Sequence, residues 1–154
     1  MQIKAAKPED AARLTEVAFA AKRHWGYPDR WMENWRDILT VKPEFIASHE
    51  TFSAVIDGQT VGFYALSRKD GRLDLLHLWV LPDWMRRGIG RSLFCHALER
   101  ARGLGFRELE IESDPNAEGF YLRMGARRVG VSIQTVEQQR RELPVLIHHL
   151  DPVT

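Results

Sequence analysis

Apolar side chains recur at helical spacing over the first forty residues. A first helix is expected from Pro8 to about Gly26, after a short strand over residues 3–6, because proline suits a first helical turn and glycine a helix end. Its apolar face is formed by Leu14, Val17, Ala18 and Ala21. A second helix is expected over about 29–39, with an apolar stripe formed by Trp31, Trp35, Ile38 and Leu39.

From Thr51 the apolar positions alternate with a period of two, which is typical of strands. Two strands, over 52–56 and 60–66, are joined by Asp57-Gly58, a strong hairpin signal. The nearly continuous apolar run 73–81 is typical of a strand buried on both faces. The remaining pattern predicts a long helix after Gly88, a short helix over 116–124, and strands over 107–112, 129–133 and 143–150. This order predicts an α/β fold with a mixed sheet and helices on its faces.

Length and composition indicate one globular domain over residues 1–154, with 44% hydrophobic and 28% charged residues and no internal repeat or linker. The formal net charge is +1, without the basic surplus expected of a nucleic-acid-binding protein. No apolar run approaches the roughly 20 residues that span a membrane. Cys95 is the one cysteine, which fits a reducing compartment. We therefore expect a cytoplasmic protein with no nucleic-acid or membrane partner.

Candidate chemistry is concentrated in the turn between the buried strand and the long helix. Glycines at 88 and 90 allow close approach of a ligand, and the N–H groups and dipole of a helix N-terminus favour an anion. Three arginines add positive charge: Arg86, Arg87 and Arg91. The turn therefore predicts a pyrophosphate site. It is not a Walker loop, because Arg91-Ser92 follows without lysine, nor a Rossmann fingerprint, because Leu93 replaces the third glycine.

Two segments resemble the Gcn5-related N-acetyltransferase (GNAT) family. Leu78-Trp79-Val80-Leu81-Pro82 followed by Gly88-Ile89-Gly90 is similar to the family's acetyl-CoA loop, with Met85 in place of the usual glutamine or arginine. Residues 114–126 resemble the family segment in which an asparagine contacts the cofactor and a tyrosine protonates the departing thiolate. Asn116 and Tyr121 are the matching positions, with a shorter spacing than in many members. The resemblance implies a single-domain GNAT fold with splayed middle strands.

The resemblance also implies acetyl-CoA as cosubstrate, no metal, and direct attack by a primary amine on the thioester. The acceptor is left open between a small-molecule amine and an exposed protein amine, and a homodimer is also left open. Tyr121 is the implied acid. The implied cofactor-binding residues are Leu78, Trp79, Val80, Arg86, Arg87, Gly88, Ile89, Gly90, Arg91 and Asn116. Two alternatives remain: a CoA-binding sensor or interaction module without turnover, and a transferase using another acyl-CoA.

Asp74 and His77 are the polar residues of the strand 73–81, and a regular strand places them on opposite faces. Asp74 would then share a face with Leu78 and Val80. Because family members commonly place a base at this position, Asp74 is the expected base; the alternative is an ordinary residue at a strand start. His77 is expected to be a hydrogen-bonded core or edge histidine.

The acceptor wall is expected in the tryptophan-rich segment 25–35. Trp25 and Tyr27 lie in the loop after the first helix, where aromatic rings can contact a cationic amine. Glu33, like His24, is a further candidate for this pocket. Trp31 and Trp35 are four residues apart, so packing in the core is the simpler interpretation for them.

Overall fold

A mixed sheet of seven strands forms the centre of the computed structural model, which describes residues 1–151. The strands are β1 (Gln2–Ala5), β2 (Glu50–Ile56), β3 (Gln59–Lys69), β4 (Arg72–Val80), β5 (Glu108–Glu112), β6 (Arg127–Val136) and β7 (Gln139–His149). Their order across the sheet is β1-β2-β3-β4-β5-β7-β6. β4 and β5 run parallel, and the other neighbouring pairs are antiparallel. The mixed sheet expected from the sequence is confirmed.

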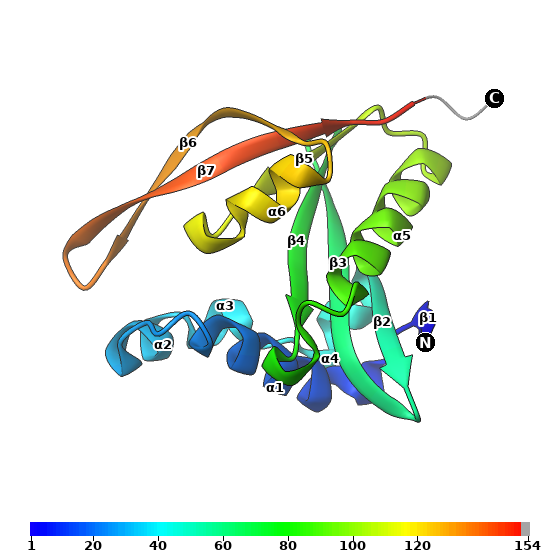
Figure 1. Cartoon of the computed structure of the whole chain (residues 1–154), viewed down its shortest axis with the longest axis horizontal. Helices are drawn as coiled ribbons and strands as arrows, with labels where there is room; N and C mark the ends of the chain where they lie inside the picture. The colour runs from blue at the N-terminus through cyan, green and yellow to red at the C-terminus, as the bar shows by residue number, and fades with distance from the viewer. Residues whose placement is uncertain (152–154) are drawn as a thin grey trace.

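Helices cover both faces of this sheet (Figure 1). They are α1 (Ala11–Arg23), α2 (Asp29–Asn34), α3 (Arg36–Leu39), α4 (Pro43–Ser48), α5 (Ile89–Gly103) and α6 (Glu118–Arg123), with 3-10 turns η1 (Pro8–Asp10), η2 (Pro82–Trp84) and η3 (Pro115–Ala117). One core cluster packs α5 and α6 on the sheet, and a second packs α1 to α4 on the opposite face. No helix within residues 1–151 is long and apolar enough to cross a membrane.

The helical region after α1 differs from its prediction. A single helix over 29–39 is wrong, because the chain leaves helical geometry at Trp35 (φ −89°, ψ 2°) and divides into α2 and α3. Trp35 is buried by this break, whereas Ile38, expected on the same stripe, is 63% exposed. A further helix, α4, begins at Pro43. The local bend therefore decides which apolar residues of this segment reach the core.

The two central strands β4 and β5 diverge. They pair only at Asp74 with Glu110 and Leu75 with Ile111, so the following part of β4 has an edge without a strand partner among the described residues. On its other side, β4 stays paired with β3 as far as Val80. A wedge-shaped opening therefore begins beyond Leu75, as the splayed strands of the expected fold require.

A β-bulge in β4 reverses the expected arrangement of its side chains. Ala65 of β3 pairs with His77, but the next residue, Leu66, pairs with Leu75, so Leu76 is an extra residue in β4. The extra residue shifts the alternation by one. Asp74 consequently lies on the face of His77 and not on that of Leu78. The prediction that Asp74 and His77 occupy opposite faces is wrong, because it assumed a regular strand.

Candidate active site

A pocket of about 450 Å³ lies where β4 and β5 diverge. Its walls come from α1, the open end of β4, the loop before α5, and the segment from the end of β5 into α6. The lining residues are Ala21, Trp25, Leu78, Trp79, Val80, Met85, Arg86, Gly88, Gly90, Arg91, Asp114, Asn116, Ala117, Gly119, Phe120, Tyr121 and Arg123. The pocket thus brings together the two motifs that the sequence analysis singled out.

The loop before α5 forms one end of this pocket. Arg86 (φ 64°) and Gly88 (φ 81°) both have left-handed backbone, and Gly88 caps the helix. Ser92 donates its N–H to the carbonyl of Gly88 at 3.0 Å, which is the first bond of the helix. The N–H groups of residues 89–91 precede that bond and have no intrahelical acceptor. This end of the pocket therefore suits an anion held by main-chain N–H groups.

Arginines reinforce this end of the pocket. Arg86, Arg91 and Arg123 line it, and their guanidinium groups suit phosphate oxygens. Arg87, also predicted from the sequence, instead stacks on the ring of Trp84 at 4.8 Å and is not among the lining residues. Ile89 is buried in the core beneath the loop, so its side chain does not line the pocket.

Tyr121 of α6 also lines the pocket. Its ring packs against Phe94 and Phe120, and the structure gives its hydroxyl no hydrogen bond within residues 1–151. Burial, followed by the negative charge of Asp114, raises the pKa of this phenol well above its ordinary value. Tyr121 therefore keeps its proton throughout the neutral and moderately alkaline range.

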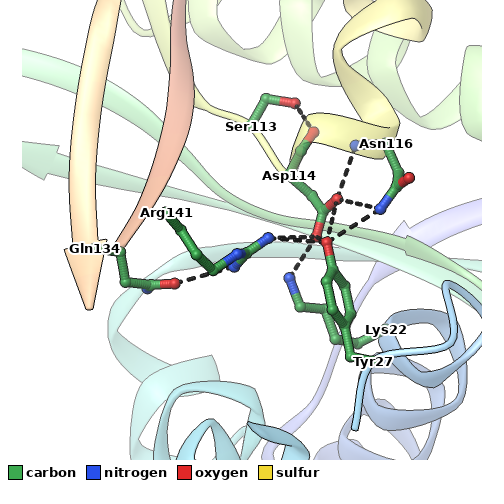
Figure 2. Close-up of polar contacts among 7 residues, drawn as sticks. All are labelled: Lys22, Tyr27, Ser113, Asp114, Asn116, Gln134 and Arg141. Atoms are coloured by element: carbon green, nitrogen blue, oxygen red, sulfur yellow. Dashed lines mark hydrogen bonds and ion pairs between the residues drawn. The ribbon is translucent and has the colours of Figure 1, made fainter. Parts of the chain in front are cut away.

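Asp114, which also lines the pocket, is the centre of a polar network (Figure 2). Its carboxylate accepts hydrogen bonds from Lys22 Nζ at 2.5 Å, from the Tyr27 hydroxyl at 2.9 Å, and from the main-chain N–H of Asn116 at 2.8 Å. Arg141 of β7 donates to the Tyr27 hydroxyl at 2.8 Å. The network connects α1, the loop after it, the end of β5, and β7.

Burial and the charges of neighbouring groups together set the pKa values in this network. Burial raises the pKa of the Asp114 carboxyl, but the charge and hydrogen bond of Lys22, with the hydrogen bonds from Asn116 and Tyr27, leave that pKa below its ordinary value. For Lys22, burial is the stronger influence, so the pKa of its ammonium is lowered despite Asp114. Burial and the charge of Asp114 raise the pKa of Tyr27 to about 12. Asp114 is thus held ionised and Tyr27 protonated.

Aromatic rings surround the two cations of the network. Lys22 Nζ lies 4.3 Å from the ring centroid of Trp35 and 4.9 Å from that of Tyr27. The Arg141 guanidinium lies over the rings of Tyr27, Trp31 and Trp35. Trp31 and Trp35 pack with the core, as their spacing predicted, and they also contact the two cations.

The other predicted catalytic and acceptor residues are not all brought together. Trp25 is 40% exposed and lines the pocket. Tyr27 directs its hydroxyl into the network, and Glu33 is exposed, paired with Arg36 on the surface. Asp74 is paired with Arg72 at 3.0 Å and does not line the pocket. Of these four, only Trp25 lies in the pocket wall.

His77 is a hydrogen-bonded core histidine, as expected. It is buried against the rings of Phe45 and Phe63, and its Nδ1 accepts the indole N–H of Trp79 at 2.9 Å. Burial, with a smaller effect of His49, lowers the pKa of His77 to about 4. The neutral ring of His77 therefore orients the indole of Trp79, and Trp79 is one of the residues that line the pocket.

Residues 11–126 match the sequence model of the acetyltransferase (GNAT) family. The chain belongs to the GNAT family. This match covers most of the chain and includes both motifs around the pocket.

Two curated N-acetyltransferases are of moderate similarity to this chain. The peptidyl-lysine N-acetyltransferase YiaC of Escherichia coli (strain K12) is 29% identical over 104 residues, which is 64% of this chain and 68% of that protein. N-acetyltransferase family 8 member 3 of Mus musculus is 28% identical over 123 residues, covering 71% of this chain and 54% of the mouse protein. The chain thus spans about half the length of the mouse relative.

Solved GNAT structures share the fold along nearly the whole chain. A GCN5-related N-acetyltransferase from Rhodopseudomonas palustris superposes with a TM-score of 0.81 at 22% identity, over 97% of this chain and 95% of that one. The PaiA N-acetyltransferase from Thermoplasma acidophilum, solved in complex with coenzyme A, has a TM-score of 0.76 at 19% identity, over 96% and 98%. The predicted GNAT fold is confirmed.

Sequence reasoning missed Lys22, Asp114 and Arg141 as members of the site. Asp114 caps the following turn by accepting the N–H of Asn116, and this local role gives no indication of its contacts with Lys22 and Tyr27. Lys22 had a detectable signal, because it falls on the apolar stripe of α1, four residues after Ala18. Arg141 had no such signal, because it lies on β7, 114 residues along the chain from its partner Tyr27.

Proposed function

We propose that this GNAT member is an N-acetyltransferase that moves the acetyl group of acetyl-CoA to a primary amine. The observation that carries the proposal is the pocket at the divergence of β4 and β5, which joins an anion-binding helix N-terminus to a buried tyrosine. The positive end of the pocket fits a pyrophosphate, and the open edge of β4 fits an extended arm leading towards Tyr121. Family membership supports the same assignment.

Acetyl-CoA would supply the activated thioester, and the chain's own groups would orient it. The N–H groups on the open edge of β4, around Leu78 to Val80, are suited to hold the thioester carbonyl and to stabilise negative charge on its oxygen. The loop from Arg86 to Arg91 would hold the phosphates. These contacts would place the carbonyl carbon for attack, which is a large part of catalysis for a reaction between two bound molecules.

Tyr121 is proposed to protonate the departing thiolate. Its phenol keeps its proton because burial and Asp114 raise its pKa. A thiol has an ordinary pKa of about 8.5, so transfer from a nearby phenol can accompany bond breaking. Asp74 lies outside the pocket and is paired with Arg72, so the proposal assigns it no direct contact with the acceptor.

The acceptor is proposed to approach past Trp25, the exposed aromatic residue of the wall. The Escherichia coli relative is a peptidyl-lysine N-acetyltransferase, which supports including lysine side chains of peptides among the acceptors to be tested. Small primary amines are the other class. Aromatic contact with a cationic amine suits both.

The direct test is incubation of the purified protein with acetyl-CoA and a panel of small amines and lysine-containing peptides. Mass spectrometry is expected to detect an acetylated amine together with free CoA. Binding of CoA without product from any amine would instead support a CoA-binding module. Parallel reactions with propionyl-CoA and succinyl-CoA would identify a preference for another acyl group.

A further inference from the structure

The Tyr27 hydroxyl has a complete set of hydrogen bonds, and their directions can be assigned. A phenol oxygen offers one proton and accepts two hydrogen bonds. Arg141 Nη2 donates to it at 2.8 Å and Asn116 Nδ2 donates to it at 3.0 Å. Both acceptor positions are therefore filled, and the Tyr27 proton is donated to the Asp114 carboxylate. The hydroxyl is thus fully hydrogen-bonded within the protein and is not available to bind an acceptor amine.

The Asp114 carboxylate is equally complete. It accepts from Lys22 Nζ, from the Tyr27 hydroxyl, and from both the main-chain N–H and the Nδ2 of Asn116. An ionised carboxylate offers about four acceptor positions, so none is left over. Asp114 therefore lines the pocket without a lone pair free to take a proton from a bound amine.

These contacts determine which way the Asn116 side chain faces. A carboxylate only accepts, so the Asn116 atom beside Asp114 must be the amide nitrogen. Its two hydrogens are used by Asp114 and Tyr27, and Figure 2 shows the amide oxygen turned away from the network. Within residues 1–151 that oxygen has no hydrogen-bond donor, and Asn116 lines the pocket.

We propose that Tyr27 and Asp114 are positioning residues, which hold the Asn116 amide so that its oxygen accepts a hydrogen bond from an amide N–H of the bound cosubstrate. This proposal rests on the proposed function, because the pantetheine arm of CoA carries two such amide groups. Tyr27 then belongs to the cofactor side of the pocket, through Asn116. The acceptor wall retains Trp25.

The test compares two ligands of the same pocket in wild type and Tyr27→Phe. CoA carries the pantetheine arm, and adenosine 3′,5′-bisphosphate carries a phosphorylated adenosine without it. Titration calorimetry is expected to show CoA binding weakened about tenfold by Tyr27→Phe, the effect of losing one net hydrogen bond. Binding of adenosine 3′,5′-bisphosphate is expected to stay within about twofold of wild type.

Two further variants separate positioning from a general structural effect. Tyr64→Phe removes a buried hydroxyl that forms a 2.6 Å hydrogen bond with His96, and neither residue lines the pocket. This variant is expected to change the affinity of neither ligand. In an Asn116→Ala background, Tyr27→Phe is expected to have no further effect on CoA binding, because the group it positions is gone.

Equal weakening of both ligands by Tyr27→Phe, an unchanged affinity for CoA, or an undiminished effect in the Asn116→Ala background would each overturn the proposal. A wild-type protein that binds no CoA would overturn the proposed function itself, and this result precedes any comparison of variants. The two failures are therefore distinguishable.

Discussion

Tyr121 is a single side chain whose environment suits the role of an acid. Its ring is buried between Phe94 and Phe120, and burial together with Asp114 raises the pKa of its phenol. A group with a raised pKa keeps its proton to higher pH. Protonation of a leaving thiolate by Tyr121 is therefore expected to persist beyond pH 10, where an ordinary tyrosine loses half of its protons.

Replacement Tyr121→Phe is expected to lower kcat by about a hundredfold or more, because general acid catalysis contributes roughly 10² to 10⁴. The KM for acetyl-CoA is expected to change little, since the ring and its packing remain. Steady-state kinetics with the best amine of the panel would measure both. A variant with wild-type kcat would remove Tyr121 from the acid role.

Asp74→Asn is the companion measurement to this prediction. Because Asp74 is paired with Arg72 outside the pocket, we expect kcat to change by less than about twofold. A tenfold loss of kcat, together with a shift of its pH dependence to higher pH, would instead support the prediction from sequence that Asp74 is the base.

His77 makes the stability of the fold depend on pH. Its pKa is about 4 in the folded chain, against 6.5 for an ordinary histidine. The unfolded chain therefore binds a proton first as pH falls, and the contribution to stability is complete above pH 6.5 and lost progressively towards pH 4. The shift corresponds to about 3 kcal/mol.

Urea unfolding at pH 7.5 and 4.5 is expected to show this loss in wild type and a smaller loss in His77→Gln, whose side chain does not titrate. His24→Gln, at an exposed position, is the matched control and is expected to behave like wild type. The same pH dependence in His77→Gln and wild type would contradict the assignment.

At the scale of elements, the divergence of β4 from β5 depends on how β4 is held by β3. Gly62 of β3 faces this strand, and a Cβ placed there would lie 2.8 Å from the carbonyl oxygen of Trp79 and 3.1 Å from Leu93. A backbone atom is the closest obstacle, so a flexible side chain cannot relieve the contact. Glycine at this position allows the open part of β4 to stay close to β3.

Gly62→Ala is therefore expected to lower the free energy of unfolding by about 1–3 kcal/mol, through overpacking between β3 and β4. Gly103→Ala is the control, because a Cβ there meets nothing within 4 Å and alanine favours the helix. Urea denaturation would measure both variants. Equal stability of Gly62→Ala and wild type would show that the strands adjust without cost.

At the scale of the whole molecule, the network around Asp114 connects the first helices to the last strands. Arg141 reaches from β7 to Tyr27, and Glu137 at the turn of the β6–β7 hairpin accepts a hydrogen bond from Asn34 of α2. Figure 1 shows the hairpin extending towards the region of α2 and α3. Segments more than one hundred residues apart in the sequence thus meet beside Asp114, which lines the pocket.

Arg141→Met is expected to loosen this connection while keeping an apolar chain against the aromatic rings. Hydrogen exchange of main-chain N–H groups in β6 and β7 is expected to become about tenfold faster, with β2 and β3 unaffected. Arg140→Met is the matched control, because the side chain of Arg140 is 68% exposed and that of Arg141 10%. Similar exchange in the two variants would contradict a specific role for Arg141.

The sequence was most informative where structure depends on nearby residues. The period of the apolar positions predicted α1, α5 and most strands, and Gly88 and Gly90 located the loop at the start of α5. It was least informative where a backbone irregularity intervenes. Neither the break at Trp35 nor the bulge at Leu76 carries glycine or proline, so neither could be seen in the pattern.

By itself, the sequence determined the fold class, the glycine-rich turn before α5 and the position of Tyr121, because each depends on residue type and spacing along the chain. Only the tertiary structure decided that Asp74 shares a face with His77 and pairs with Arg72, and that Lys22, Tyr27 and Arg141 meet at Asp114. The reason is physical. A one-residue bulge reverses the faces of a strand. Folding also buries together charged residues that are far apart in the sequence, and a buried charge needs a partner.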